Sequence, residues 1–452
     1  MKKIRIGVLG GYRGTSMINY CKAADNAELV AICDNAPGVI EMQKKLTEGM
    51  DIAFYDNFED FIKHDMDAVV LANYANEHAP YAIRAMRAGK HVFSEVLPVQ
   101  TMKEAVALVE AVEETGMIYA YGENYCFMPA PFEMKKLYRQ GRIGEFEYGE
   151  CEYIGSYEPI WHSITYGERD HWRNNMYSTF YCTHSIGPII HATGLKPVSV
   201  IGFEGGRNER PLRNGCKGAQ FGITMITLEN GAIIKSINGC FLYEHSVWYN
   251  MYGSKGMMES ERSVTVEGDQ EATGQDGIVR TIVGGDGTQR IYVKADEYSG
   301  QYAGRPAEHY MPLRGLEKMS DNFNHGGSDF YSMYYFVERI KGDKTADIID
   351  VYEALDMFLP GMFAYRSILE DGKRMQIPDL RDKSIRDLWR NDTACVDPKV
   401  AGAQLLPTQK GGTPDIDDAV YARVKAKWDK ANETGDDAYL QAAFSQGSQK
   451  EK

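Results

Sequence analysis

The sequence predicts an α/β protein: an N-terminal doubly wound parallel sheet, followed by an α+β domain with an open, mostly antiparallel sheet. Three observations predict this fold. Short apolar runs alternate with helix-period segments over the first third of the chain, a glycine-rich turn follows the first run, and strand-like runs joined by tight turns come later. Because strand, helix and strand alternate at this rhythm, the crossovers are right-handed and the first strands lie parallel.

Five short apolar runs mark the strands of the first domain. They are expected at Ile4–Leu9, Leu29–Cys33, Ala68–Ala72, His91–Phe93 and Ile118–Tyr121. Segments with the period of an amphipathic helix separate them, at Thr15–Ala24, Gly38–Lys45, Pro80–Ala88 and Met102–Glu114. Since ligands bind sheets of this kind at the carboxyl ends of the strands, site residues are expected directly after these runs.

The pattern changes after Met128. A helix is expected at Ala130–Arg139, with later helices at Ser328–Lys341 and Tyr352–Ile368. Alternating runs joined by turns such as Glu229-Asn230-Gly231 predict largely antiparallel strands, at Glu145–Tyr153, Val198–Glu204, Phe221–Leu228, Ile233–Cys240 and Val247–Tyr252. The polar segment 260–322 is expected to form strands and loops, and the tail is expected to end in a charged helix, Val420–Asn432. The expected domains are 1–124, 125–385 and a C-terminal extension, 386–452.

Composition narrows the function classes. A chain of 452 residues with 43% apolar content can bury two cores. Its formal charge of −14 argues against a general nucleic-acid binder, which needs clustered Lys and Arg. The eight cysteines show no C-x-x-C spacing, and the first apolar run breaks at Gly10-Gly11, too early for a signal peptide. No run is long enough to span a bilayer, so we expect a soluble, cytoplasmic protein with reduced thiols.

A glycine-rich turn follows the first expected strand. Gly10, Gly11 and Gly14 are one residue short of the G-x-G-x-x-G spacing, and a plain tight turn would also explain them. Their position favours dinucleotide binding, because Asp34 closes the second strand, where an acid bonds the adenosine ribose. The first domain is therefore expected to be a Rossmann domain. A carboxylate at Asp34 repels a 2′-phosphate, so NAD is expected in preference to NADP.

The stretch from Tyr181 to Pro188 is the main candidate for chemistry. If it is helical, the phenol of Tyr181 and the imidazole of His184 lie on one face and can reach a single substrate. Histidine changes charge nearest neutral pH, and a cation such as Arg169 or Arg173 can bring a tyrosine toward that range. The alternative is that both side chains are half-buried polar groups bonded to backbone.

Further motifs carry a resemblance to a known family. The chain has Asn73-Tyr74-Ala75-Asn76-Glu77-His78, then Ala88-Gly89-Lys90-His91-Val92, then Glu95. These resemble the T-P-N-x-x-H, A-G-K-H-V and E-K-P motifs of the Gfo/Idh/MocA oxidoreductases, which oxidise sugars and polyols. Val96 and Leu97 replace the Lys and Pro of the last motif. The lysine of that family accepts the hydroxyl proton as hydride leaves, so either this protein oxidises nothing or another group has taken over that role.

One branch of that family is similar to this chain along residues 1 to 385. The NAD-dependent glycoside hydrolases first known as α-N-acetylgalactosaminidases carry E-V-P, N-C-C-Y, W-R, Y-P-T-H-x-x-G-P and H-G-G-x-D-F. The counterparts here, in the same order, are Glu95-Val96, Asn124-Tyr125-Cys126-Phe127, Trp172-Arg173, Tyr181-Cys182-Thr183-His184-Ser185-Ile186-Gly187-Pro188 and His325-Gly326-Gly327-Ser328-Asp329-Phe330. Phe127 departs from the pattern, since the branch has tyrosine there.

The resemblance implies a hydrolysis without net redox change: transient oxidation at C3, deprotonation at C2, elimination at C1, water addition and re-reduction. We expect Tyr181 to be the C2 base, helped by Arg173, and His184 to accept the C3 hydroxyl proton, although the two roles can be exchanged. Glu95 and His325 are expected to position sugar or nicotinamide. The expected NAD-binding residues are Gly10, Gly11, Tyr12, Arg13, Gly14, Asp34, Asn73, Asn76, His78, Glu95 and Asn124.

Two other functions stay open. The protein can be an ordinary NAD-dependent sugar or polyol dehydrogenase in which His184 replaces the lost lysine, or a non-catalytic NAD and sugar sensor. No metal is expected, because the histidines and cysteines lack zinc-like spacing. Arg207, Arg210, Arg213 and Lys217 can form a solvated run or receive an anionic substrate. The expected partners are a carbohydrate or glycoside and further copies of the chain, as a homodimer or homotetramer.

Overall fold

The structure is a computed structural model that describes residues 2–260, 279–283, 289–293, 323 and 327–434. Two compact units make up the chain, and each combines separate stretches. The first unit holds Met1–Phe127, Gly315–Leu355 and Leu380–Thr393, and the second holds Met128–Arg314, Asp356–Asp379 and Ala394–Lys452. The site residue His325 and most of the expected strands and loops of 260–322 lie outside the described residues.

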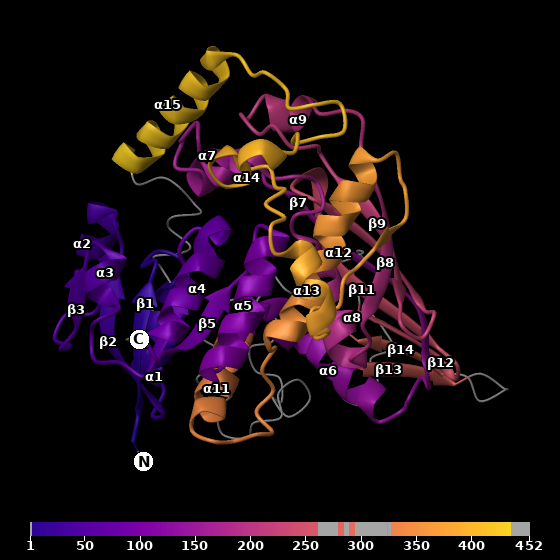
Figure 1. The fold of residues 1–452 in the computed structure, drawn as a ribbon, viewed down its shortest axis with the longest axis horizontal. Helices are drawn as coiled ribbons and strands as arrows, with labels where there is room; N and C mark the ends of the chain where they lie inside the picture. Colours follow the sequence, from indigo (N-terminus) through magenta and orange to yellow (C-terminus); the bar gives the residue numbers. More distant parts are fainter. Residues whose placement is uncertain (1, 261–278, 284–288, 294–322, 324–326, 435–452) are drawn as a thin grey trace. The chain divides into compact units, whose positions relative to one another are not determined.

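The first unit contains a six-stranded parallel sheet of order β3-β2-β1-β4-β5-β6 (Figure 1). This confirms the doubly wound fold, because the order reverses direction between β1 and β4. The strands are β1 Ile4–Leu9, β2 Ala27–Cys33, β3 Ala53–Tyr55, β4 Ala68–Leu71, β5 His91–Glu95 and β6 Tyr119–Gly122. Every residue of β4 is buried, as expected for a central strand covered on both faces.

Helices connect these strands. They are α1 Thr15–Ala23, α2 Pro37–Leu46, α3 Phe58–Phe61, α4 His78–Arg87 and α5 Met102–Thr115, with 3-10 turns η1 Ala75–Glu77 and η2 Asn124–Phe127. The bounds of α5 follow from local chemistry. The Thr101 hydroxyl caps its start by accepting the Glu104 N–H at 3.1 Å, and Gly116 ends it at a φ of +65°. The sequence patterns did not predict two short elements of this unit, β3 and α3.

Two later segments of the chain complete the first unit. Helix α11, Ser328–Ile340, packs its aromatic face on the unit, with Phe330 5.2 Å from Tyr20 and Phe336 5.7 Å from Phe93 between ring centroids. Helix α13, Lys383–Trp389, is held to α5 by an ion pair between Arg386 and Glu113. Helix α12, Val351–Leu369, spans the boundary between the two units.

The second unit contains a nine-stranded sheet of order β13-β14-β12-β11-β7-β10-β9-β8-β15. Six of its eight strand pairings are antiparallel; β10 with β7 and β12 with β14 are parallel, so the predicted mostly antiparallel sheet is confirmed. The strands are β7 Phe146–Ser156, β8 Pro197–Glu204, β9 Gly222–Leu228, β10 Ile233–Gly239, β11 Phe241–Gly253, β12 Gly256–Ser260, β13 Val279–Val283, β14 Gln289–Val293 and β15 Met375–Gln376.

One face of this sheet packs on helices. Helix α8, Cys182–Thr193, contacts β7, β10, β11 and α6, Pro129–Arg139, and every residue of α8 but the last is buried. The other described helices of the unit are α7 Trp161–Ile164, α9 Glu209–Leu212, α14 Pro398–Ala401 and α15 Asp418–Thr434, with 3-10 turns η3 Glu158–Ile160, η4 Trp172–Asn175 and η7 Gly402–Gln404. Helix α15 confirms the predicted charged helix near the C-terminus.

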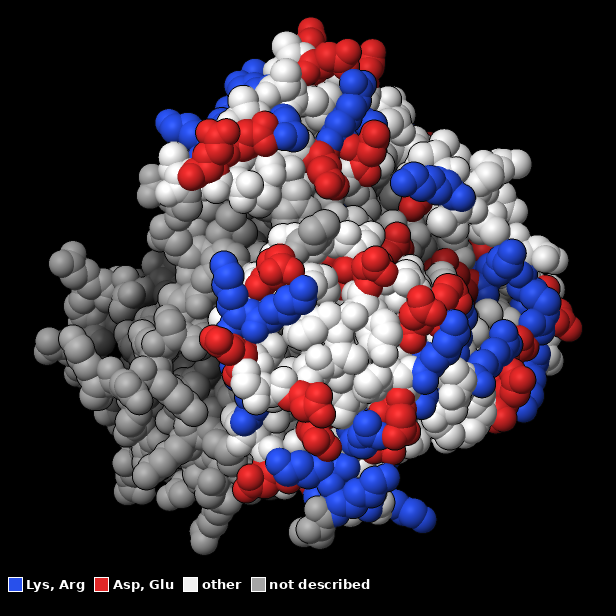
Figure 2. Space-filling view, turned by 90° about the vertical axis from the view of Figure 1, so that its left-hand side faces the viewer, with Lys and Arg blue, Asp and Glu red and all other residues white. Residues whose placement is uncertain are grey.

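The surface carries charges of both signs. Figure 2 shows Lys and Arg interspersed with Asp and Glu on one face. Exposed ion pairs of the protein include Lys63 with Asp60 and Lys44 with Glu41. Within the described ranges, no helix is long and apolar enough to cross a membrane.

Candidate functional site

The turn between β1 and α1 depends on glycine. Gly10 has a φ of +91°, and a Cβ there would lie 2.4 Å from the carbonyl carbon of Ala72. A Cβ on Gly14 would lie 2.4 Å from the Gly10 carbonyl oxygen. Gly14 occupies the N-cap of α1 without a side-chain cap, so the positive end of the helix faces the glycine turn. The turn therefore forms a close-packed backbone cradle at the carboxyl end of β1.

Asp34 follows β2, as the sequence predicts. Its Oδ2 accepts the Gly11 N–H at 2.8 Å and its Oδ1 accepts the Ala36 N–H at 2.9 Å. Burial raises the pKa of Asp34, and the two backbone N–H groups partly offset this by stabilising the carboxylate. These bonds tie the end of β2 to the glycine turn after β1.

The segment after β4 is organised around His78. This buried ring lies with Nδ1 3.0 Å from the Leu97 carbonyl oxygen and Nε2 3.3 Å from the Asn73 carbonyl oxygen. Burial lowers the pKa of His78 to about 4, so the ring is neutral at pH 7 and links the ends of β4 and β5. The carbonyl of Asn76 accepts a bond from Gln100 at 2.6 Å. The side-chain Oδ1 of Asn73 is buried and has no hydrogen-bond partner among the described residues, which leaves an acceptor for a ligand.

Arg13 joins the glycine turn to two carboxylates. Its Nη2 donates to Glu95 Oε1 at 2.8 Å and its Nη1 donates to Asp329 Oδ2 at 3.2 Å. The Asn124 amide donates to Asp329 Oδ1 at 2.9 Å. Three predicted site residues, Arg13, Glu95 and Asn124, are thus linked through Arg13 and Asp329 in the first unit. Asp329 belongs to a motif recognised in the sequence, but no role was predicted for it. Tyr12, in the same turn, has its hydroxyl buried, and its predicted cofactor contact stays a prediction, as do those of the other residues.

These residues fit a dinucleotide. The glycine cradle leaves no room for a Cβ, Asp34 lies where a ribose is bonded in such folds, and Asn73 offers a buried acceptor at the end of β4. All lie at the carboxyl ends of the parallel strands.

The pair Tyr181 and His184 lies at the start of α8 in the second unit. Tyr181 is the N-cap residue, and its ring stacks on that of His184 with 5.4 Å between centroids and 4° between planes. The prediction that the two side chains share one face is therefore confirmed. The His184 side chain is buried. The backbone carbonyl of His184 accepts a hydrogen bond from the Tyr249 hydroxyl at 2.8 Å.

A third aromatic side chain completes this cluster. The ring of Tyr153, on β7, lies 4.8 Å from that of His184 and 6.0 Å from that of Tyr181. Its hydroxyl is 2.8 Å from that of Tyr157, and a Cβ on Gly155 would lie 2.2 Å from the Tyr157 ring, so Gly155 makes room for this contact. Sequence reasoning missed Tyr153; its signal was the alternation along β7, which places it on the same face as the buried Cys151.

Hydrogen bonds beneath α8 fix its position. Ser185 Oγ lies 2.6 Å from Ser236 Oγ and donates to Asn238 Oδ1 at 3.0 Å, linking the first turn of α8 to β10. Just before the helix, Thr179 donates to the Gly361 carbonyl at 2.7 Å. Because these groups are buried and bonded to one another, they hold the aromatic pair in one orientation.

The two arginines expected near Tyr181 contact other aromatic rings. The Arg173 guanidinium lies over the Trp172 ring, 4.4 Å from its centroid, and donates to the Ile164 carbonyl at 3.4 Å. Arg169 pairs with Asp418 at 2.6 Å and covers the Tyr421 ring. Assistance to Tyr181 from Arg173 stays a prediction.

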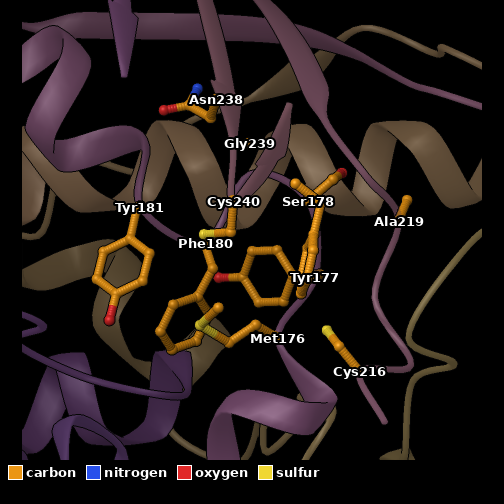
Figure 3. A pocket seen from close by; sticks show the side chains of 11 residues that line it. Met176, Tyr177, Ser178, Phe180, Tyr181, Cys216, Ala219, Asn238, Gly239 and Cys240 are labelled. Carbon is orange, nitrogen blue, oxygen red and sulfur yellow. The ribbon is translucent and has the colours of Figure 1, made fainter. Parts of the chain in front are cut away.

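A small pocket adjoins Tyr181 in the second unit. Figure 3 shows Tyr181 beside Phe180, whose rings are 5.5 Å apart, with Tyr177 and the thiols of Cys216 and Cys240 also on the wall. Burial raises the pKa of both thiols to about 12, so they are unreactive at neutral pH. The pocket has room for water rather than for a sugar ring.

Two arginines of the basic run share one carboxylate. Arg210 is buried and pairs with Glu158, whereas Arg213 pairs with the same carboxylate but keeps 52% of its side chain exposed. Among the described residues, no group of three or more His, Cys, Asp or Glu is arranged to hold a metal ion.

The chain matches two protein-family models. Residues 4–123 match the model "Oxidoreductase family, NAD-binding Rossmann fold", and residues 223–386 match "Glycosyl hydrolase 109, C-terminal domain". A glycosyl hydrolase family 109 protein of Shewanella pealeana is 24% identical over 415 residues, covering 86% of this chain and 87% of the relative. One of Solibacter usitatus is 25% identical over 412 residues, covering 83% and 88%.

Solved structures share the fold. Scyllo-inositol dehydrogenase from Lactobacillus casei, with bound NAD(H) and scyllo-inositol, superposes with a TM-score of 0.60 at 17% identity, covering 83% of this chain and 99% of that one.

Proposed function

Because the chain belongs to the Gfo/Idh/MocA oxidoreductase family, with an NAD-binding Rossmann domain and a glycosyl hydrolase 109 C-terminal domain, we propose that it is an NAD-dependent glycoside hydrolase. The observation that carries this proposal is the stacked pair of Tyr181 and His184 on α8. These side chains stand in the sequence motif that the hydrolase branch shares, and Val96 cannot accept a proton in place of the lysine typical of the family.

The glycine cradle and Asp34 hold the dinucleotide, with Asn73 as a further acceptor. When bound, NAD supplies a hydride acceptor for the C3 position of a sugar and later returns the hydride. Two protons must leave the sugar as well, one from the C3 hydroxyl and one from C2, which a C3 ketone acidifies. His184 accepts the first proton and Tyr181, in its phenolate form, accepts the second, or the two roles are exchanged, since the rings stack on each other.

The surroundings of the pair suit proton transfer. His184 is buried, its backbone is anchored by Tyr249, and Tyr153 packs against both rings. A fixed orientation lowers the cost of arranging a base toward a bound substrate. The protonated group then returns its proton to the glycosidic oxygen or to the sugar, so that the hydrolysis leaves the protein unchanged.

Turnover in deuterated water tests the proposal. A chromogenic glycoside of each anomer is supplied to the protein, and the released sugar is analysed by NMR and mass spectrometry. Deuterium at C2 is expected, because the proton removed there exchanges with solvent. His184→Gln and Tyr181→Phe should each lower turnover by about 10²-fold or more while leaving NAD binding unchanged. Cleavage that leaves C2 unlabelled would rule out the elimination step.

An NAD-dependent sugar or polyol dehydrogenase is the second candidate. The similarity of the fold to an inositol dehydrogenase favours it. In that case a single proton acceptor suffices, and free polyol with NAD should give steady accumulation of NADH. A glycosidase working by the route above should release its aglycone without net NADH, so one absorbance assay with both substrates separates the two functions.

We also propose that the chain forms a homodimer or homotetramer through the sheet of the second unit. Strand β9 alternates buried and half-exposed residues, and Ile223 is one of the half-exposed ones. Its neighbours across the sheet are Phe203 on β8 and Ile237 on β10. Phe203 is 54% exposed and Ile233 is 39% exposed. An apolar sheet face of this kind is typical of an interaction surface, and sedimentation analysis tests the assembly.

A further inference from the structure

Helix α15 lies against α7 and the turn that follows it in the second unit (Figure 1). The ring of Trp428 on α15 is 5.5 Å from that of Tyr166 in the turn, with 71° between the ring planes. The next residue, Gly167, has a φ of +62°, and a Cβ there would lie 2.9 Å from both the Lys425 Cα and the Trp428 Cβ. The helix can therefore approach the turn this closely because residue 167 is a glycine.

The turn is held in an uncommon conformation. Tyr166 has a φ of +52°, which few residues other than glycine adopt and which persists only where the surroundings hold it. The contact with Trp428 is one restraint. Asn174 supplies another from η4, because its amide donates to the Glu168 and Arg169 carbonyls at 3.0 and 3.1 Å. The turn is thus tied both to α15 and to η4.

A continuous series of ring contacts leads from α15 to the proposed proton acceptors. The separation between neighbouring ring centroids is between 5.4 and 5.9 Å throughout. The Trp172 Nε1 is buried and has no hydrogen-bond partner among the described residues, so packing rather than hydrogen bonding fixes the indole. Because closely packed rings transmit a displacement to their neighbours, the position of the first ring bears on that of the last. The rings, in order, are those of Trp428, Tyr166, His171, Trp172, Phe180, Tyr181 and His184.

We propose that Trp428 is a positioning residue for the reaction at Tyr181 and His184, because it holds the turn and, through the ring series, the orientation of both proton acceptors. The proposal rests on the function proposed above, since a misplaced acceptor matters only if the pair transfers protons. Helix α15 begins at Asp418, beyond residues 223–386, which match the glycosyl hydrolase 109 C-terminal domain. The C-terminal extension thus supports the site from outside that domain.

The first readout is steady-state turnover by the full chain. Trp428→Ala should lower kcat for a chromogenic glycoside about tenfold, because a small displacement of a catalytic base is costly. The KM and the dissociation constant of NAD should stay unchanged, since the orientation of the acceptors acts on the transition state rather than on binding. Trp428→Phe keeps a ring and should stay within about twofold of the wild type. Asp418→Asn is the matched control: it removes the exposed ion pair of α15 with Arg169, leaves the rings in place and should keep the wild-type kcat.

The second readout is the NMR signal of the His184 ring, which does not depend on catalysis. Protein isotopically labelled in its histidine rings is compared among the variants, and the line that disappears in His184→Gln is that of His184. A Tyr181 ring that turns or moves shifts this line, because the two rings are stacked and its ring current acts on nearby nuclei. Partial unfolding lowers the intensity of the line without moving it, so this readout separates positioning from stability. The line should move in Trp428→Ala and keep its position in Trp428→Phe and Asp418→Asn.

The outcomes distinguish this inference from the proposed function. If the His184 line stays in place in Trp428→Ala, the inference is overturned, whatever the value of kcat. An unchanged kcat in an active protein overturns it as well. If the line moves but the wild type cleaves no glycoside, the dependence of the pair on α15 stands and the hydrolase proposal fails. Should Trp428→Ala fail to fold, Tyr166→Asn removes the next ring of the series and must move the line in its place, because asparagine tolerates a positive φ.

Discussion

Replacing Gly10 by alanine tests whether the turn after β1 is a cradle that only glycine can form. A positive φ costs a non-glycine residue about 1–2 kcal/mol. At Gly10, with a φ of +91°, the new Cβ would also lie 2.4 Å from the carbonyl carbon of Ala72, and overlap with fixed backbone typically costs about 1–3 kcal/mol more. The turn must then move away from the end of β4, so we expect about 3 kcal/mol less stability and at least about tenfold weaker NAD binding.

Gly89 provides the matched control. It lies in the same unit with a φ of +77°, and a Cβ there would meet nothing within 4 Å. Gly89→Ala should therefore lose only about 1–2 kcal/mol and bind NAD as the wild type does. Urea unfolding gives the free energies and calorimetric titration gives the affinities. If Gly10→Ala were no less stable than Gly89→Ala and bound NAD equally well, the close approach of the turn to β4 would be refuted.

Three further predictions concern separate features. Asp34→Asn should lower the ratio of the NADP to the NAD dissociation constant at least about tenfold, because the charge that repels a 2′-phosphate is gone; an unchanged ratio in paired titrations would contradict this. Phe203→Lys should shift the assembly to a smaller species in analytical ultracentrifugation without lowering the melting temperature, since its side chain is 54% exposed; an unchanged mass would exclude this face. Gly155→Ala should push the Tyr157 ring away from Tyr153 and lower turnover as far as Tyr157→Phe does, so wild-type turnover in the alanine variant would show that the phenol contact is dispensable.

Local patterns predicted the elements well where local forces decide them. The bounds of β1 and the start of α5 agree with the sequence expectation, because an apolar run ends at glycine in one case and a threonine cap opens the helix in the other. The turn Glu229-Asn230-Gly231 joins β9 and β10 as expected, with Gly231 at a φ of +89°. Segments of three or four residues, such as β3 and α3, are too short for a period to be recognised.

Long-range assembly was beyond sequence patterns. The expected domains were consecutive, whereas the first unit takes in α11 and α13 from far along the chain. These helices join it through buried rings such as Phe330 and through the pair of Arg386 with Glu113, and neither contact has a local signature. The same holds for Asp329, which meets Arg13 across 316 positions of sequence.

The number of proton acceptors on α8 bears on the choice between the two proposed functions. Oxidation of a hydroxyl by hydride transfer releases one proton, and one imidazole suffices to take it. Elimination releases a second proton, from carbon, which needs a second base held in a fixed orientation. The imidazole of His184 and the phenol of Tyr181 are stacked at 5.4 Å, and the hydroxyl of Tyr249 and the ring of Tyr153 restrain them. If both side chains accept protons as proposed, the site meets the requirement of the elimination route and exceeds that of a simple dehydrogenase, which is our reason for proposing the hydrolase first.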